Sequence, residues 1–240
     1  TFVHTNTKFG GKHMKISPTL TEVKEIAKTG KYDILPVSCE ILSDFITPIE
    51  AMRILQNVST HCYLLESAQA NEAWGRYTFL GYDPKLEINC IDGHMKLGKL
   101  SVETENPSEY IRQILSEYKS PKFDYLPSFT GGLVGYFSYD YLGYKEKSIR
   151  GKARDTEDFK DVDLMLFDKV IAFDNLCQKI ILIANMSLDA PETGYNKAIV
   201  ELKQLRELLM HGEKKQNMGG KLLGDVTPLF EKDQYCEMVE

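Results

Sequence analysis

The sequence contains two arms rich in aromatic and aliphatic residues, Cys62-Tyr63-Leu64-Leu65-Glu66-Ser67 and Arg76-Tyr77-Thr78-Phe79-Leu80-Gly81-Tyr82-Asp83-Pro84, separated by a loop from Ala68 to Gly75 that contains Gln, Asn and Glu. Aromatic and aliphatic residues of this kind suit extended chain, and two such runs around a polar loop are typical of a hairpin. The pattern therefore predicts two neighbouring antiparallel strands.

Such a hairpin brings the end of the first strand, Glu66 and Ser67, close to the start of the second, Arg76 and Tyr77. An acid, a hydroxyl and a guanidinium at one sheet edge suit a small zwitterion, because Glu66 can take an ammonium while Arg76 or the hydroxyl takes a carboxylate. The alternative is a plain cross-strand ion pair between Glu66 and Arg76, a normal device of sheets. Spacing alone does not choose between them.

The helix signals along the chain are local. Thr19-Leu20-Thr21-Glu22 and Thr47-Pro48-Ile49-Glu50 both have the form of a capping box, and proline at the first helical position is favoured. The second of these helices is expected to bury Ile49, Met52 and Leu55. The expected helices cover about 20–29, 48–57, a stretch from 107, and 191–210, the longest.

Strands are expected between these helices. Residues 32–42 are expected to form a strand at the edge of a sheet, because they contain Pro36. Asp92-Gly93 is expected to be a tight turn between two short strands. Residues 130–140 read as a core strand, while 163–173 and 178–185 read as one long hairpin covered on both faces. The fold class is therefore α+β, with mostly antiparallel sheets of orthogonal or sandwich type and helices packed on the outside.

Composition narrows the class of protein. The 240 residues are 42% hydrophobic and carry a net charge of -6, with no basic face, so nucleic acid is not an expected partner. No apolar run approaches the roughly 20 residues of a membrane-spanning helix, so no membrane is expected. The five cysteines lack metal-ligand spacing, which predicts no metal site and structural thiols in a reduced cytoplasmic setting.

The chain is expected to divide into four parts. Residues 1–13 lack any periodic pattern and are interpreted as a flexible extension or cloning remnant. Residues 14–211 form the main domain, and 212–229, rich in Gly and Lys, form a linker. Residues 230–240 begin an amphipathic helix without a stop signal, which predicts that a further domain has been cut off there.

Four segments resemble those of one enzyme family, anthranilate synthase component I. Leu64-Leu65-Glu66-Ser67 and Gly75-Arg76-Tyr77-Thr78-Phe79-Leu80-Gly81-Tyr82-Asp83-Pro84 are similar to its LLES and GRYSFxGxDP segments. Gly131 to Asp140 resembles GGxxGYxxYD, and Asp44 to Pro48 resembles D-x-x-TP. The resemblance implies that 14–211 is the N-terminal domain of such an enzyme and that 230–240 starts its catalytic half.

The resemblance also implies a function. The full-length enzyme converts chorismate to anthranilate and pyruvate in tryptophan biosynthesis, with ammonia from a glutamine amidotransferase subunit. Ser67 and Glu66 are expected to contact tryptophan as feedback inhibitor, with Arg76 and Tyr77 adding to the pocket. The catalytic residues and Mg²⁺ are expected in the other half, so this chain alone should contain no catalytic residue or cofactor and be inactive.

Two alternatives remain open. The first is the N-terminal part of aminodeoxychorismate synthase, in the same superfamily, although LLES followed by the long Arg76 to Pro84 segment favours the tryptophan enzyme. The second is a non-catalytic module whose charged 145–161 loop and 191–210 helix bind a partner.

Overall fold

The computed structural model describes residues 14–67, 75–148, 159–216 and 219–240. The described helices are α1 (Leu20–Lys28), α2 (Pro48–Val58), α3 (Pro107–Ser116), the 3-10 helix η1 (Tyr139–Tyr144), α4 (Pro191–His211) and α5 (Lys232–Val239). Residues 1–13, interpreted above as an extension, and 149–158 of the charged loop lie outside the described residues.

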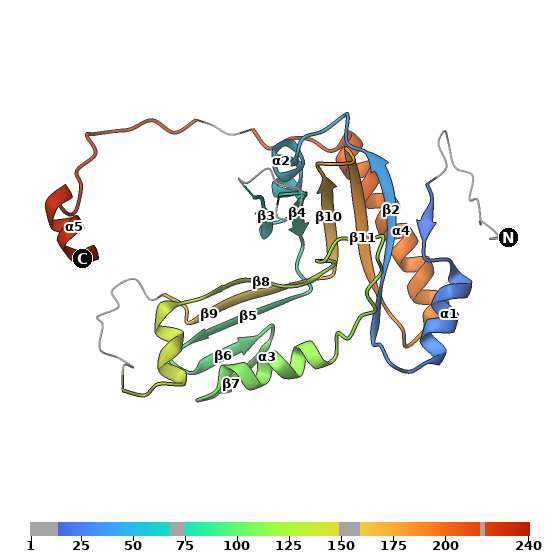
Figure 1. The fold of residues 1–240 in the computed structure, drawn as a ribbon, viewed down its shortest axis with the longest axis horizontal. Coiled ribbons are helices and arrows are strands. Elements are labelled where there is room, and N and C mark those ends of the chain that lie inside the picture. Colours follow the sequence, from blue (N-terminus) through green and yellow to red (C-terminus); the bar gives the residue numbers. More distant parts are fainter. Residues whose placement is uncertain (1–13, 68–74, 149–158, 217–218) are drawn as a thin grey trace.

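The strands form two antiparallel sheets (Figure 1). Sheet A has the order β1 (Ile16–Ser17), β2 (Ile34–Leu42), β11 (Lys179–Ser187), β10 (Lys169–Asp174), β4 (Tyr77–Tyr82), β3 (Cys62–Leu65). Sheet B has the order β7 (Leu100–Glu103), β6 (His94–Leu97), β5 (Leu86–Ile91), β9 (Val162–Phe167), β8 (Gly132–Phe137). The predicted α+β class with mostly antiparallel sheets is confirmed.

Helices cover one face of each sheet. Both predicted capping boxes form at the starts of α1 and α2, and α4 buries residues at helical spacing, including Leu202, Leu205 and Leu209. These three helices pack on one face of sheet A and make the largest core. Sheet B has its own core, in which Ile111 of α3 meets Ile88 and Leu164.

The chain changes sheets within residues 163–173, at the charged pair Asp168-Lys169. The run 163–173, predicted as one hairpin arm, is two strands, because β9 ends at Phe167 and β10 begins at Lys169. At the corner the carbonyl of Asp168 accepts hydrogen bonds from the backbone N–H (2.8 Å) and side-chain amide (3.0 Å) of Asn185. The single-arm prediction was wrong because the charged pair Asp168-Lys169, which interrupts the apolar residues at the corner, does not by itself show that the two halves join different sheets.

Three further expectations need correction. The segment predicted as a core strand, β8, lies at the edge of sheet B, with Phe137 49% exposed. Ile49, predicted to point inward, is 54% exposed, and α2 buries Ala51, Ile54 and Leu55. Strand β2, predicted as an edge strand because of Pro36, lies between β1 and β11 in sheet A. Proline is tolerated there because β1 pairs only with Ser38 and Cys39 and leaves Pro36 unpaired on that side.

The C-terminal part leaves the sheets after α4. The described residues from 213 to 231 are exposed and form no helix or strand. Helix α5 follows, as predicted, and none of its residues is buried. In Figure 1 it stands apart from both sheets. The boundaries assigned to the linker and to the start of a further domain stay predictions.

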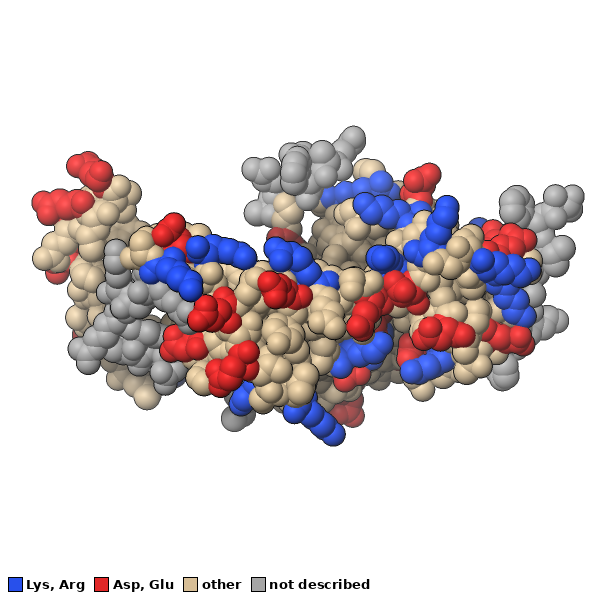
Figure 2. Space-filling model, turned by 90° about the horizontal axis from the view of Figure 1, so that it is seen from below, with Lys and Arg blue, Asp and Glu red and all other residues tan. Residues whose placement is uncertain are grey.

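The surface carries charges of both signs. On the face seen in Figure 2, the described Lys and Arg side chains are intermixed with Asp and Glu. No described helix is long and apolar enough to cross a membrane.

Candidate functional site

The predicted hairpin forms at one edge of sheet A. Strands β3 and β4 pair antiparallel, with Cys62 opposite Tyr82 and Leu65 opposite Phe79. Strand β3 ends at Leu65, so Glu66 and Ser67 follow the last paired residue, and both are exposed. The two arms therefore meet as the sequence predicted, with Glu66 and Ser67 just beyond the paired end of β3.

The strand register separates the two residues that follow β3. Continuing the observed pairing by two positions sets Ser67 opposite Tyr77 and Glu66 opposite Thr78. Successive residues of a strand point to opposite faces of the sheet. If the chain stayed extended beyond Leu65, the serine would lie on the face of Tyr77 and the acid on the other face.

Arg76 forms its ion pair with Asp174, at the end of β10. Its Nε donates to Asp174 Oδ1 at 3.1 Å and its Nη2 donates to Oδ2 at 2.7 Å. The Asp174 side chain is fully buried, and that of Arg76 is 36% exposed. The alternative of a Glu66–Arg76 pair is wrong, because β10 lies beside β4 in the sheet and brings its own carboxylate to the guanidinium.

Further hydrogen bonds join the hairpin to the turn between β10 and β11. Asp174 Oδ1 also accepts the backbone N–H groups of Leu176 (3.2 Å) and Cys177 (3.1 Å). The backbone N–H of Asn175 donates to the carbonyl of Arg76 at 2.9 Å. The Arg76 guanidinium carbon lies 4.8 Å from the centre of the Tyr77 ring, a cation–π distance. The hairpin mouth and the turn form one connected unit.

The pKa shifts agree with this geometry. Burial acts to raise the pKa of Asp174, but hydrogen bonds from Arg76 and from the backbone N–H of Cys177 outweigh it, so that its pKa is lowered. The hydrogen bond to Asp174 raises the pKa of Arg76. Burial raises the pKa of Tyr77. At neutral pH the site therefore holds an ionised Arg76–Asp174 pair beside a neutral tyrosine.

Aromatic side chains line the sheet face next to Ser67. Ring centres lie 5.8 Å apart for Tyr77 and Phe79, and 5.6 Å apart for Phe79 and Phe129 in an edge-to-face arrangement. Tyr63 meets Phe129 at 6.4 Å, and its buried hydroxyl has no hydrogen-bond partner among the described residues. On this face, called the aromatic wall below (Tyr63, Tyr77, Phe79 and Phe129), Tyr63 is buried and the other three rings are partly exposed, so these three offer apolar surface to a further ring.

Sequence reasoning missed part of this site. Phe79 could have been found, because it alternates with Tyr77 along the same strand. Asp174 and Phe129 reach the hairpin only through sheet pairing and loop packing, and no local pattern marks them.

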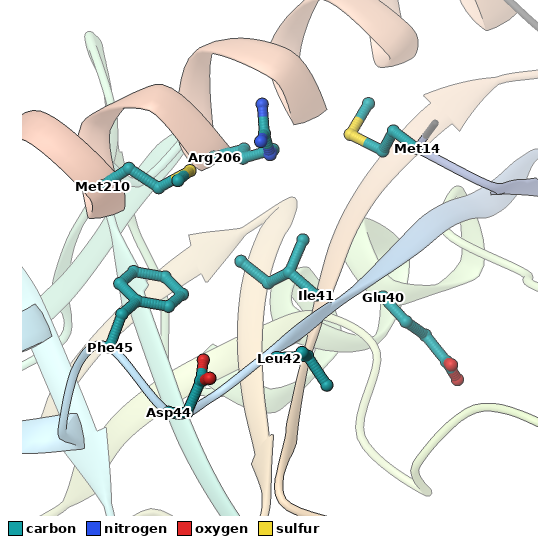
Figure 3. Close-up of a pocket in the computed structure, with 8 residues that line it drawn as sticks. All are labelled: Met14, Glu40, Ile41, Leu42, Asp44, Phe45, Arg206 and Met210. Atoms are coloured by element: carbon teal, nitrogen blue, oxygen red, sulfur yellow. The ribbon is translucent and has the colours of Figure 1, made fainter. Parts of the chain in front are cut away.

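A separate pocket of about 340 Å³ lies between α4 and the end of β2. In Figure 3 its apolar lining includes Phe45 and Met210, with Asp44 and Arg206 on opposite sides. Asp44 and Phe45 open the segment that resembled D-x-x-TP. The four predicted effector residues, Glu66, Ser67, Arg76 and Tyr77, do not line it.

None of the five cysteines forms a disulfide; Cys39 and Cys90 are buried, while Cys177 and Cys236 are exposed. Burial raises the pKa of Cys39 to about 12. Across the described ranges, no group of three or more His, Cys, Asp or Glu side chains is placed to hold a metal ion.

Comparison with known proteins identifies the class. Residues 60–240 match the family model of the chorismate binding enzymes, and the chain belongs to this family. Its resemblance to anthranilate synthase component I is confirmed by curated relatives of that name. The protein of Acetivibrio thermocellus is 34% identical over 198 residues, covering 80% of this chain and 39% of the relative. That of Pseudomonas aeruginosa is 36% identical over 186 residues, covering 74% and 37%.

A crystal structure of anthranilate synthase component I from Streptococcus pneumoniae is also similar, with 25% identity and a TM-score of 0.46. The match covers 69% of this chain and 36% of that one. The chain spans about two fifths of the length of the curated relatives that it matches.

Proposed function

We propose that this chain is the regulatory and scaffolding portion of an anthranilate synthase component I. The full-length enzyme would convert chorismate to anthranilate and pyruvate, with ammonia supplied by a glutamine amidotransferase subunit. The observation that carries the proposal is the similarity to curated anthranilate synthase component 1 proteins over most of this chain. We assign no catalytic residue or metal ligand to these residues, and Mg²⁺ would act in the remainder of the enzyme.

The proposed effector is tryptophan, held at the mouth of the β3–β4 hairpin. Its carboxylate suits the Ser67 hydroxyl or Nη1 of Arg76. Its ammonium suits the exposed carboxylate of Glu66, which would reach around the open edge of sheet A, because Glu66 follows the last paired residue of β3, the edge strand. The other two nitrogens of the Arg76 guanidinium, Nε and Nη2, already donate hydrogen bonds to Asp174. The indole ring suits the aromatic wall, where Tyr77 would lie on the same face as Ser67.

Inhibition would follow from a difference in affinity between two arrangements of the enzyme. An effector shifts an equilibrium only as far as it binds one state better than the other, and such coupling is typically about 1–3 kcal/mol. We propose that tryptophan at the hairpin mouth stabilises the less active arrangement.

Replacing Ser67 with leucine in the full-length enzyme tests the site. Because leucine removes the hydroxyl and fills its space, we expect the tryptophan concentration for half-inhibition to rise about tenfold or more, equivalent to about 1.4 kcal/mol. Uninhibited turnover should stay near normal. The measurement is anthranilate formation from chorismate over a tryptophan titration.

Ser101→Leu is the matched control, since Ser101 is an exposed serine on β7 of the other sheet. Its inhibition should match the wild type. Unchanged inhibition in Ser67→Leu would remove Ser67 from the site. A 4-amino product in place of anthranilate would instead identify an aminodeoxychorismate synthase.

A further inference from the structure

Asp174 is a fully buried carboxylate that the proposed effector contacts do not include. It lies at the end of β10, where Asp174 pairs with Tyr77 of β4 in the sheet register. We propose that Asp174 is a positioning residue of the effector site, which fixes the guanidinium of Arg76 over the Tyr77 ring. This inference rests on the proposed function, because it assumes that the hairpin mouth binds an effector.

The first argument is geometric. A bidentate pair sets both the position and the plane of a guanidinium, which a single contact cannot do. The two bonds, at 3.1 and 2.7 Å, occupy Nε and Nη2 and leave the Nη1 side for another partner. Asp174 is itself held by the backbone N–H groups of Leu176 and Cys177. The guanidinium is thus fixed to the sheet before any ligand arrives.

The second argument concerns the conformational freedom of the Arg76 side chain. An arginine side chain loses much rotamer freedom when it is held, and a ligand that must order it binds more weakly. Arg76 is 36% exposed, so without its partner the side chain would be free to extend into solvent. Because the structure holds it in place through Asp174, a carboxylate that reaches Arg76 does not have to order it.

A purely structural role is the competing explanation, since Asp174 also caps the turn after β10. The variant Asp174→Asn separates the two roles. Its side-chain oxygen, in the place of Oδ1, can still accept from the N–H groups of Leu176 and Cys177 and from Nε of Arg76. Its NH₂ group, in the place of Oδ2, faces Nη2 of Arg76 and cannot accept from it. The turn after β10 therefore keeps its hydrogen bonds, while the Arg76 guanidinium loses its bidentate contact.

The experiment measures tryptophan inhibition and chorismate kinetics of the full-length enzyme. We expect Asp174→Asn to raise the inhibition constant for tryptophan about tenfold, the scale of one charged hydrogen bond, while KM for chorismate changes less than twofold. Lys179→Met is the matched control, because Lys179 lies opposite Asp174 in the β10–β11 register and forms a 2.8 Å ion pair with Glu40 but no hydrogen bond or ion pair with Arg76. Its inhibition constant should stay at the wild-type value.

The outcomes separate this inference from the proposed function. Relief of inhibition in Ser67→Leu together with an unchanged inhibition constant in Asp174→Asn overturns the role of Asp174 alone. An equal rise in Lys179→Met also overturns it, since that would show general weakening of the sheet end. No relief in Ser67→Leu removes Ser67 from the effector site and so counts against the proposed function, whatever Asp174→Asn does. If Asp174→Asn does not fold, Arg76→Lys replaces it, because lysine keeps the charge but cannot form the fork; an unchanged inhibition constant then overturns the proposal.

Discussion

The Arg76–Asp174 pair shows how one residue contact can connect distant parts of the chain. The two residues are 98 positions apart in sequence, and they join the mouth of the β3–β4 hairpin to the turn after β10. A buried charge is costly unless it is paired and hydrogen-bonded, and Asp174 meets that requirement through Arg76 and two backbone N–H groups. Removing Arg76 would therefore leave the buried Asp174 carboxylate without its counter-ion, which is energetically costly.

This pair predicts a pH dependence of stability. The pKa of Asp174 is lowered in the folded protein, so the unfolded chain binds this proton more readily. The stabilisation is then complete above the ordinary aspartate pKa of about 3.9 and is lost as pH falls through the lowered pKa. We expect the wild type to be more stable than Asp174→Asn at about pH 6, with the gap narrowing toward about pH 3.

Urea unfolding of both proteins across that range measures the gap. A difference in unfolding free energy that does not change with pH would show that folding does not lower the pKa of Asp174. Ser101→Leu serves as the control, because Ser101 is exposed on β7 of the other sheet and its side chain carries no charge.

Among the elements, β8 depends on a glycine. Gly135 has φ +153°, and a Cβ built there would lie 1.9 Å from the carbonyl oxygen of Asp163 on the neighbouring strand β9. Gly30, after α1, has φ +61° but no atom within 4 Å of such a Cβ. The two positions share a left-handed φ and differ in the space available.

Alanine at these two glycines should therefore destabilise the protein unequally. Gly30→Ala pays backbone strain of roughly 1 kcal/mol, while Gly135→Ala adds a backbone clash and should cost roughly 3 kcal/mol or more. Thermal or urea unfolding of the two variants measures the difference. Equal losses would show that β8 can move away from β9 without cost.

Local sequence signals predicted the elements well where the interaction itself is local. The capping boxes of Thr19 and Thr47 need only a partner three residues away, and both form. The predicted burial of Ile49 was wrong because helical spacing alone does not show which face of the helix packs on the sheet. Ala51, Ile54 and Leu55 define that face, and Ile49 falls nearly opposite.

Contacts between distant segments set the limit of prediction. The hairpin carrying Glu66, Ser67, Arg76 and Tyr77 was recognised from its two arms, but the partner of Arg76 was not. That partner depends on β10 lying beside β4, which no local pattern encodes. The break at Asp168 and the edge position of β8 depend on strand order in the same way.

At the scale of the whole molecule, two sheets with separate cores meet at one corner. The core of sheet A includes residues from α1, α2 and α4, whereas that of sheet B includes α3. An ion pair of 2.8 Å between Lys169 and Asp83 joins the two places where the chain crosses between the sheets. The candidate effector site lies in sheet A, away from the core of sheet B.

This arrangement predicts unequal protection from hydrogen exchange. Strands β10 and β11 are interior to sheet A and almost wholly buried, while β7 is an edge strand with mostly exposed residues. Opening free energies follow buried contacts, so amides of β10 and β11 should exchange roughly 100-fold or more slowly than those of β6 and β7. Hydrogen exchange read by mass spectrometry on peptides from each strand measures the difference. Equal slow exchange in both groups would show that the two sheets open only together, as one cooperative unit, and that their separate cores do not act as separate units of stability.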